Sequence, residues 1–256
     1  MSIAEVPKAS DLIDFLVNKG NGVKGLSQMG LEIVPQKFIQ PHEERLDFTQ
    51  IVSSESIPII DDFSTSDDPK GCRIDCDAAE KWGFFQIINH GIPVEVLEDV
   101  IEAGHKFFEL PVEERRKVYD SDDDENTKLW PAVSNPELTA GAGRHADVSS
   151  ITMLLQDDVG GLYVREPKGD GWIHVPPVKG ALVINIGDVL QIMSNDRYKS
   201  VEHRVIVNGS RNRVSVPIFV NPAPDAVFGP LTQVLKWRNH CISRLFLYSD
   251  YFTVFQ

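Results

Sequence analysis

The chain has 256 residues, of which 42 % are hydrophobic, and its formal net charge at pH 7 is −13. This length and apolar content suffice for one large core, or for a core with a smaller lobe. The negative charge argues against nucleic acid and anionic membranes as partners. The chain has three cysteines, too few for a disulfide framework, and no apolar run near the roughly 18 residues of a membrane-spanning helix. We therefore expect a cytoplasmic protein.

The first 120 residues combine helical patterns with two strand-like segments. Ser10 is a plausible N-cap for the first helix, and Pro111 interrupts the longest one. The expected helices cover residues 10–19, 69–83 and 93–119, and the expected strands cover residues 56–63 and 84–91. This alternation predicts an N-terminal α/β lobe over residues 1–120.

An acidic run, SDDDEN, follows this lobe at residues 121–126. Blocks of like charge repel one another and are usually solvated, so we assign residues 121–137 to an acidic linker. Beyond it, short apolar runs alternate closely with Gly- and Asn-containing turns. The expected strands are residues 148–156, 161–166, 172–177, 181–187, 201–207 and 213–220. Together with the two earlier strands, they predict a mainly β fold with a double-stranded β-helix, or jelly roll, over residues 138–256.

The segment GRHADVSSITMLLQDD at residues 143–158 places His145 and Asp147 two positions apart. Side chains at this spacing on a strand point to the same face. A second histidine, His203, lies on another expected strand. Two imidazoles and one carboxylate are the ligands of non-haem Fe(II) oxygenases, which leave positions open for a co-substrate and dioxygen. The same set also suits Zn²⁺, and a turn-capping aspartate beside a structural histidine explains the pattern equally well.

Arg213 and Ser215 form a second pair on the last expected strand, and Pro217 and Phe219 continue the same face. A buried guanidinium is costly unless it meets an anion, and its planar donors suit a carboxylate. One hypothesis is a dicarboxylate that binds iron at one end and Arg213 at the other. The alternative is an ion pair between Arg213 and an acidic residue of the chain.

Longer segments resemble a known family, the plant 2-oxoglutarate- and Fe(II)-dependent dioxygenases. The resemblance rests on GRHADVSSITMLLQDDVGGLYV, GDVLQIMSNDRYKSVEHRV and NRVSVPIFVNP, and on DAAEKWGFFQIINHGIP near the N-terminus. It implies that His145, Asp147 and His203 hold Fe(II), and that Arg213 and Ser215 bind the distal carboxylate of 2-oxoglutarate. The implied reaction couples the conversion of 2-oxoglutarate and O2 to succinate and CO2 with hydroxylation of a substrate. No catalytic residue beyond the metal centre is implied, and ascorbate is the expected reductant.

Within this family, residues 194–205 (SNDRYKSVEHRV) and 215–222 (SVPIFVNP) are most similar to enzymes that hydroxylate feruloyl-CoA or scopoletin in coumarin synthesis. The resemblance therefore implies a small aromatic substrate of the phenylpropanoid or coumarin type. Phe219 would form an aromatic wall of the substrate pocket. The sequence does not indicate an oligomeric state.

The chain departs from the family between Tyr119 and Asn135. Family members have several helices there and a strand with an N-x-Y-P-x-C-P segment, whose tyrosine helps to hold 2-oxoglutarate. Trp130 and Pro131 resemble a remnant of this part, and no residue replaces the tyrosine. We therefore expect an incomplete jelly roll with an uncovered sheet edge.

The C-terminal residues 237–256 also differ from the family, which continues into a helix that helps to close the active site. Three alternatives to a 2-oxoglutarate-dependent dioxygenase stay open. They are a non-catalytic relative that binds metal or a small ligand, a zinc hydrolase, and an oxidase of the same fold that does not use 2-oxoglutarate. The zinc hydrolase leaves Arg213 and Ser215 unexplained.

Overall fold

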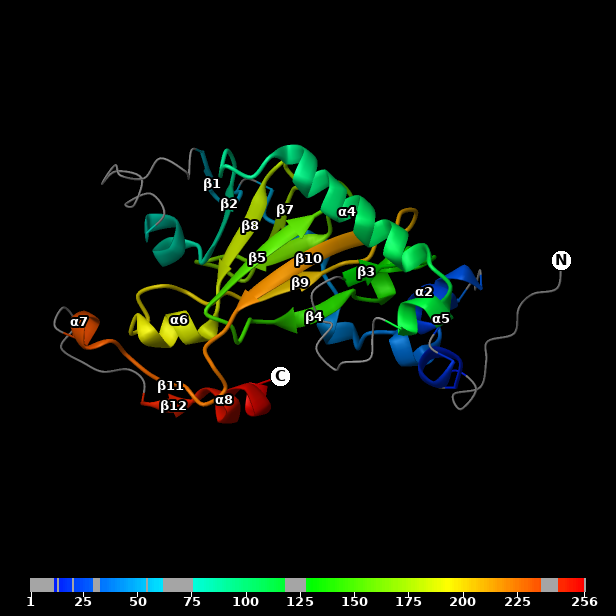
Figure 1. Cartoon of the computed structure of the whole chain (residues 1–256). Coiled ribbons are helices and arrows are strands. Elements are labelled where there is room, and N and C mark those ends of the chain that lie inside the picture. Colours follow the sequence, from blue (N-terminus) through cyan, green and yellow to red (C-terminus); the bar gives the residue numbers. More distant parts are fainter. Residues whose placement is uncertain are drawn as a thin grey trace.

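A computed structural model of the chain describes residues 12, 14–19, 21–29, 33–53, 55–61, 76–117, 128–235 and 244–255. Two β-sheets face each other and form its centre (Figure 1). The larger sheet contains, in spatial order, β1 (Ile59–Ile60), β2 (Phe84–Ile87), β8 (Leu182–Ile186), β5 (Ile151–Gln156), β10 (Arg213–Val220) and β3 (Lys128–Trp130). The smaller contains β4 (Ala142–His145), β9 (His203–Val205), β6 (Leu162–Arg165) and β7 (Trp172–Val175). Among these strands β1 and β2 alone pair in parallel, and the two sheets do not close into one barrel among the described residues.

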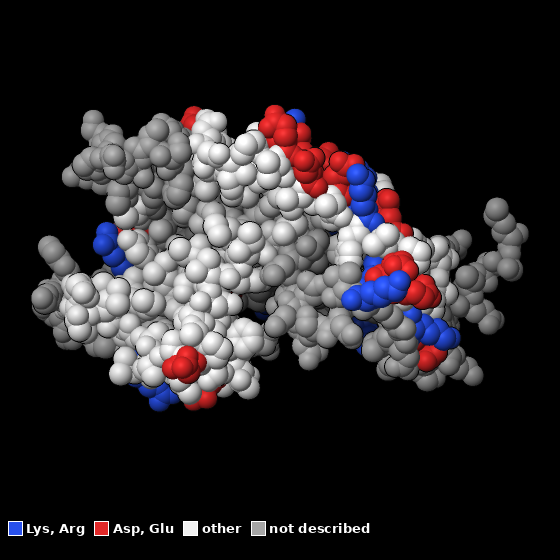
Figure 2. Space-filling model, in the orientation of Figure 1, with Lys and Arg blue, Asp and Glu red and all other residues white. Residues whose placement is uncertain are grey.

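Helices and short turns surround the sheets. The helices are η1 (Asp14–Asn18), α2 (Gly22–Gln28), α4 (Val94–Glu109), α5 (Val112–Arg116), α6 (Asp188–Met193), α7 (Thr232–Leu235) and α8 (Tyr248–Phe255), and residues 76–81 are also helical. The 3-10 turns are η2 (Gln36–Phe38), η3 (His42–Glu44), η4 (Phe48–Gln50) and η6 (Pro136–Leu138). The longest helix, α4, lies along β3, β5 and β10, and Figure 2 shows acidic side chains gathered over it. No described helix is long and apolar enough to span a membrane.

The alternation of side chains along the strands explains the two apolar layers. Phe84 and Val183 face the smaller sheet, where they join a buried core with Leu162, Val164, Ile173, Val175 and Val205. Their neighbours Phe85 and Ile184 point the other way, into a second core beneath residues 76–81. Continuous apolar runs such as FFQI are typical of strands that are covered on both faces.

The mainly β jelly roll is confirmed, and each strand expected after residue 138 forms. The first expected helix, over residues 10–19, differs: its described part contains one π-helical turn, η1. Cys72, residues 121–127 of the expected linker and the first part of the helix over residues 69–83 lie outside the described residues. The two early strands join the larger sheet, so the N-terminal lobe and the jelly roll share one sheet.

The sheets are not closed, as expected, but a short strand covers the start of β10. The short strand β3 pairs antiparallel with it, and Trp130, Leu129 and Lys128 lie opposite Arg213, Val214 and Ser215. The residues immediately after the acidic run therefore supply a substitute edge strand.

The C-terminal residues form a helix, α8 (Tyr248–Phe255). In α8, Tyr248 is buried with Val189 of α6 and Phe228 of β11 (Val227–Phe228), which pairs with β12 (Phe246–Leu247). Tyr251 donates a hydrogen bond to Asp188 at the start of α6, at 3.1 Å. The C-terminal helix thus braces α6.

Candidate metal centre

The pairing of β4 with β9 brings the two histidines together. His145 and His203 are directly opposite each other in this pair, and their ring centroids are 4.2 Å apart. β4 ends at His145, so Asp147 lies in the turn that follows. The alternation of side chains along a strand is therefore the wrong reason for the meeting of His145 and Asp147. The turn toward β5 brings the carboxylate between the imidazoles.

The three side chains converge on a common point. Asp147 Oδ1 lies 3.7 Å from His145 Nε2 and 3.6 Å from His203 Nε2. One donor atom from each residue lies within 4.8 Å of the other two. Asp147 and His203 are buried, whereas His145 is exposed to solvent. A ligand can therefore approach the cluster from the His145 side.

Two buried hydrogen bonds orient the carboxylate of Asp147. Thr152 of β5 donates to Asp147 Oδ2 at 2.5 Å, and Asn185 of β8 donates to the same oxygen at 2.8 Å. Oδ2 is thereby occupied, and Oδ1 remains directed at the two imidazoles. Such supporting hydrogen bonds are typical of metal-ligating carboxylates.

Backbone carbonyls orient both imidazoles. His145 Nδ1 lies 2.8 Å from the carbonyl oxygen of Gly143, and His203 Nδ1 lies 3.2 Å from that of Val201. A carbonyl oxygen only accepts hydrogen bonds, so Nδ1 carries the proton in each ring. Each Nε2 therefore presents its lone pair to the cluster, as metal binding requires.

The protonation states suit a metal site. Burial lowers the pKa of His203 to about 4, with an opposing effect of Asp147 and a further lowering by His145. His203 is therefore neutral at pH 7. Burial acts to raise the pKa of Asp147, but His203 and the hydrogen bonds from Thr152 and Asn185 outweigh it and hold that pKa below its usual value. With His203 neutral, these two hydrogen bonds stabilise the carboxylate.

The donor set fits a divalent metal ion such as Fe(II). It offers two imidazole nitrogens and one carboxylate oxygen on one side of a common point, and the other side remains open. Such a site binds metal through three protein ligands and leaves further positions to small molecules. The geometry alone also fits Zn²⁺.

A row of paired residues crosses the larger sheet beside this cluster. Thr152 lies opposite both Phe219 on β10 and Asn185 on β8, and Asn185 lies opposite Phe84 on β2. The Phe84 ring packs edge-on against His203 at 5.2 Å. Paired residues share a face, so the row points toward the metal ligands. Sequence reasoning missed Thr152, Asn185 and Phe84, although a polar residue within the apolar run LVINI is a signal for Asn185.

A second polar cluster lies farther along the same inner face. Arg213 is 1 % exposed and donates to Ser215 Oγ at 2.8 Å and to Gln156 Oε1 at 3.0 Å. The indole Nε1 of Trp130 donates to Ser215 Oγ at 3.3 Å. Thr152 and Gln156 share a face of β5 four residues apart, so this cluster lies roughly 13 Å along the strand from the metal ligands.

The guanidinium of Arg213 has no carboxylate within 4.0 Å among the residues that the structure describes. This finding disfavours the internal ion pair. Its buried Nε has no hydrogen-bond partner there either. Burial lowers the pKa of Arg213 to about 10, although Asp157 acts to raise it, so the side chain is charged at pH 7. A buried charge in this state favours a bound anion.

Two family models match the chain. The 2OG-Fe(II) oxygenase superfamily matches residues 119–222, and the N-terminal model of the non-haem dioxygenase in morphine synthesis matches residues 57–157. The model of the oxygenase superfamily includes both histidines, Asp147, Arg213 and Ser215.

Curated relatives from several plants resemble almost the whole chain. Feruloyl CoA ortho-hydroxylase 1 of Arabidopsis thaliana is 42 % identical over 334 residues, which cover 96 % of this chain and 92 % of the relative. Feruloyl CoA ortho-hydroxylase F6H1-1 of Ipomoea batatas is 41 % identical over 328 residues, with 94 % and 92 % coverage. The latter alignment is 72 positions longer than this chain of 256 residues, so the relative contains residues without a counterpart here.

Solved structures agree with the sequence comparisons. JOX2 in complex with 2OG, Fe, and JA is 27 % identical, has a TM-score of 0.77, and the match covers 91 % of this chain and 92 % of JOX2. The dioxygenase for auxin oxidation from rice has a TM-score of 0.69 at 21 % identity, over 78 % of this chain and 94 % of that protein, and so shares the fold. On these grounds the chain belongs to the 2OG-Fe(II) oxygenase superfamily, whose members use Fe(II) and 2-oxoglutarate.

Proposed function

We propose that this protein hydroxylates the aromatic ring of a phenylpropanoid CoA ester, at the ortho position, with Fe(II), 2-oxoglutarate and dioxygen. The observation that carries the proposal is the pairing of a His-Asp-His cluster with a buried arginine that has no carboxylate partner among the described residues. The identity of about 41 % to feruloyl CoA ortho-hydroxylases supports the substrate class.

In this proposal His145, Asp147 and His203 hold Fe(II). The chemistry supplied by the iron is the activation of dioxygen, which couples decarboxylation of 2-oxoglutarate to hydroxylation of the substrate. The protein fixes the ligand atoms in advance. The backbone carbonyls set the imidazole tautomers, and Thr152 and Asn185 direct Asp147 Oδ1 toward the cluster.

Arg213 and Ser215 bind the distal carboxylate of 2-oxoglutarate in this proposal. Ser215 Oγ accepts hydrogen bonds from both Arg213 and Trp130. A hydroxyl oxygen has two lone pairs, so both are occupied and the single O–H is free to donate to an anion. Trp130 thus acts as a positioning residue that fixes the direction of the Ser215 hydroxyl.

Phe219 forms a wall of the substrate pocket in this proposal. It lies opposite Thr152, which contacts the metal ligand Asp147, and therefore shares the face that carries the metal centre. An aromatic side chain there offers a flat apolar surface to the ring of the substrate. We further propose that the protein works in the cytoplasm, where the CoA ester and 2-oxoglutarate are both small soluble substrates, and that it has no nucleic-acid partner because its net charge is −13.

An anaerobic titration tests the co-substrate site first. Purified protein receives Fe(II) and then 2-oxoglutarate, and the visible charge-transfer band of chelated 2-oxoglutarate is followed. We expect saturation near one equivalent of each. Folded protein that gives no band would support the non-catalytic relative instead.

Turnover then tests the substrate. We expect feruloyl-CoA or coumaroyl-CoA to yield an ortho-hydroxylated product with an equal amount of succinate, and free ferulic acid to serve as the matched control for the CoA group. Hydroxylation without consumption of 2-oxoglutarate would identify the alternative oxidase. Hydrolysis of the thioester without oxidation, in the presence of Zn²⁺, would identify the hydrolase.

A further inference from the structure

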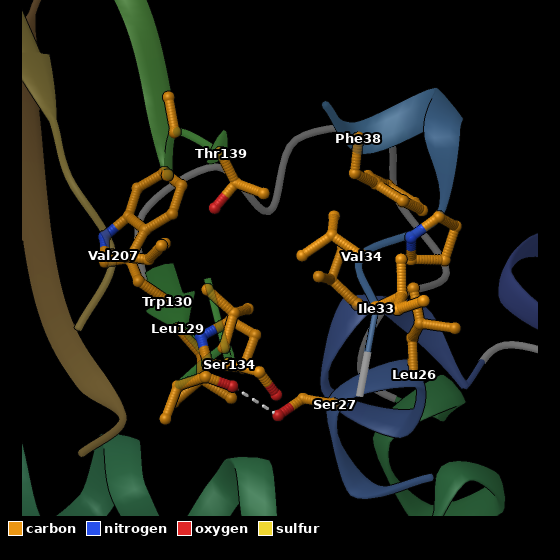
Figure 3. Close-up of a pocket in the computed structure, with 17 residues that line it drawn as sticks. Leu26, Ser27, Ile33, Val34, Phe38, Leu129, Trp130, Ser134, Thr139 and Val207 are labelled. Carbon is orange, nitrogen blue, oxygen red and sulfur yellow. Dashed lines mark hydrogen bonds between the residues drawn. The ribbon is translucent and has the colours of Figure 1, made fainter. Parts of the chain in front are cut away.

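A cavity lies apart from the metal centre, between α2 and η2 on one side and the segment that follows β3 on the other (Figure 3). Its volume is about 350 Å³, and none of the metal ligands lines it. Leu26, Ile33 and Val34 form one apolar wall, and Leu129 and Val207 belong to the other. Apolar cavities of about 150 Å³ bind benzene in other proteins, so this space accommodates a substituted aromatic ring.

One polar group in this cavity has no hydrogen-bond partner among the described residues. The hydroxyl Oγ1 of Thr139 is buried and makes no hydrogen bond with the residues that the structure describes. Thr139 itself is 9 % exposed, and Figure 3 shows its oxygen directed into the cavity. The hydroxyl of Ser27, by contrast, donates to the carbonyl oxygen of Ala132 at 2.6 Å. A buried hydroxyl without a partner is unfavourable, and a ligand with one hydrogen-bonding group would supply the missing hydrogen bond.

Two aromatic side chains face each other across the same space. Phe38 from η2 and Trp130 from β3 lie on opposite sides of the cavity in Figure 3. Aromatic walls favour a flat ring as the occupant, since ring pairs gain energy beyond the area that they bury. We propose that this pocket binds a small aromatic molecule with one hydroxyl group, whose ring lies between Phe38 and Trp130 and whose hydroxyl pairs with Thr139.

Trp130 connects this pocket to the co-substrate residues. Its ring lines the pocket, while its indole N–H donates to Ser215. An occupant that packs against the ring restricts the indole to the position that makes this hydrogen bond. Occupancy therefore strengthens binding of 2-oxoglutarate, an effect that rests on the proposed role of Ser215, and the coupling is reciprocal.

A binding experiment tests the pocket without iron or 2-oxoglutarate. Calorimetric titrations of the full chain with 4-methylphenol and with toluene compare two molecules that differ by one hydroxyl. For Thr139→Val, we expect the affinity for 4-methylphenol to fall about five-fold, the equivalent of one hydrogen bond, and the affinity for toluene to stay the same or rise. An equal effect on both compounds, or no binding of either, would overturn the proposal.

Two further variants show where the compounds bind. Ala140→Leu places a larger side chain in the lining of the pocket, and we expect it to abolish binding of both molecules. Thr253→Val changes an exposed threonine on α8 and should leave both affinities unchanged. Binding that survives in Ala140→Leu would place the compounds elsewhere and refute the site. Circular dichroism and thermal unfolding verify that each variant is folded.

The coupling is measured separately, by titration of the Fe(II) protein with 2-oxoglutarate at saturating and at zero 4-methylphenol. We expect the affinity for 2-oxoglutarate to rise two- to five-fold, and this rise to vanish in Ala140→Leu, which does not bind 4-methylphenol. Binding of 4-methylphenol without any change in 2-oxoglutarate affinity would disprove the coupling. Absence of the charge-transfer band under both conditions would instead refute the proposed function, and the binding experiment would still decide the pocket.

Discussion

The metal end of the jelly roll, with His145, Asp147 and His203, and its proposed co-substrate end, with Gln156, Arg213 and Ser215, differ in how completely their polar groups are hydrogen-bonded. At the metal end, Thr152 and Asn185 hold Asp147, and backbone carbonyls hold both histidines. At the proposed co-substrate end, two buried groups lack hydrogen-bond partners among the described residues. They are Arg213 Nε and Gln156 Nε2.

This difference follows from where each end takes its support. Asp147 is oriented from β5 and β8, which are paired at the centre of the larger sheet, and the histidines are oriented by backbone carbonyls in or beside β4 and β9 of the smaller sheet. The proposed co-substrate residues Arg213 and Ser215 lie opposite β3, the three-residue strand that begins after residue 127. We infer that a missing internal segment, as expected from the longer relatives, weakens the co-substrate end more than the metal end.

The largest effect is expected at the metal end. His203→Ala removes one of three ligands, and we expect the iron content to fall from about one equivalent to near zero. His174→Ala is the matched control, because His174 lies on β7 of the same sheet and is only partly buried. Iron analysis after desalting measures the effect. An unchanged iron content in His203→Ala would refute the assignment of the metal ligands.

At the co-substrate end, Arg213→Ala should weaken 2-oxoglutarate binding at least about 100-fold, since hydrogen bonds to charged groups contribute roughly 1.5–3 kcal/mol each. Metal affinity should change little, because Arg213 contacts Ser215 and Gln156 and none of the metal ligands. The charge-transfer titration and a metal titration report the two quantities.

Arg211→Ala is the control for this change. Arg211 lies two residues away and pairs with Asp158 on the surface, so its loss should leave 2-oxoglutarate binding intact. Equal losses of metal and 2-oxoglutarate binding in Arg213→Ala would indicate a structural role for Arg213.

A smaller effect should follow from the support of the metal ligands. Thr152→Val removes the hydrogen bond to Asp147 Oδ2 while it keeps the shape of the side chain. Loss of such a bond typically lowers metal affinity about 10- to 100-fold. Thr152→Ser retains the hydroxyl and should restore most of the affinity. If serine and valine behave alike, the hydrogen bond does not orient the carboxylate.

The sequence predicted the central strands of this molecule better than the edge strand β3. Apolar runs separated by turns identified β5 to β10, because each strand is buried on at least one face. His145, Asp147 and His203 were found from ligand types and spacing, although the strand β4 ends before Asp147. The backbone turn that joins them depends on pairing with β9, which is far away in the sequence.

The residues that hold the metal ligands and the strand that pairs with Arg213 and Ser215 could not be predicted from local sequence patterns. Asn185 and Thr152 act through contacts between strands, and nothing in their neighbourhood along the chain indicates the partner Asp147. The strand β3 has three residues and follows an acidic run, so it carries no periodicity to detect. Its role emerges only from its register against Arg213 and Ser215.

The smallest expected effect tests whether β3 replaces the lost part of the co-substrate end. Trp130→Phe keeps an aromatic ring but removes the N–H that donates to Ser215. One neutral hydrogen bond contributes about 1 kcal/mol, so we expect 2-oxoglutarate affinity to fall about five-fold, with metal affinity unchanged. The same change in Ser215→Ala should cause no further loss, because Trp130 acts only through the Ser215 hydroxyl. If the losses of 2-oxoglutarate affinity in Trp130→Phe and Ser215→Ala add fully in the double variant, Trp130 does not act through the Ser215 hydroxyl. The packing of β3, and not the direction of that hydroxyl, would then support 2-oxoglutarate binding.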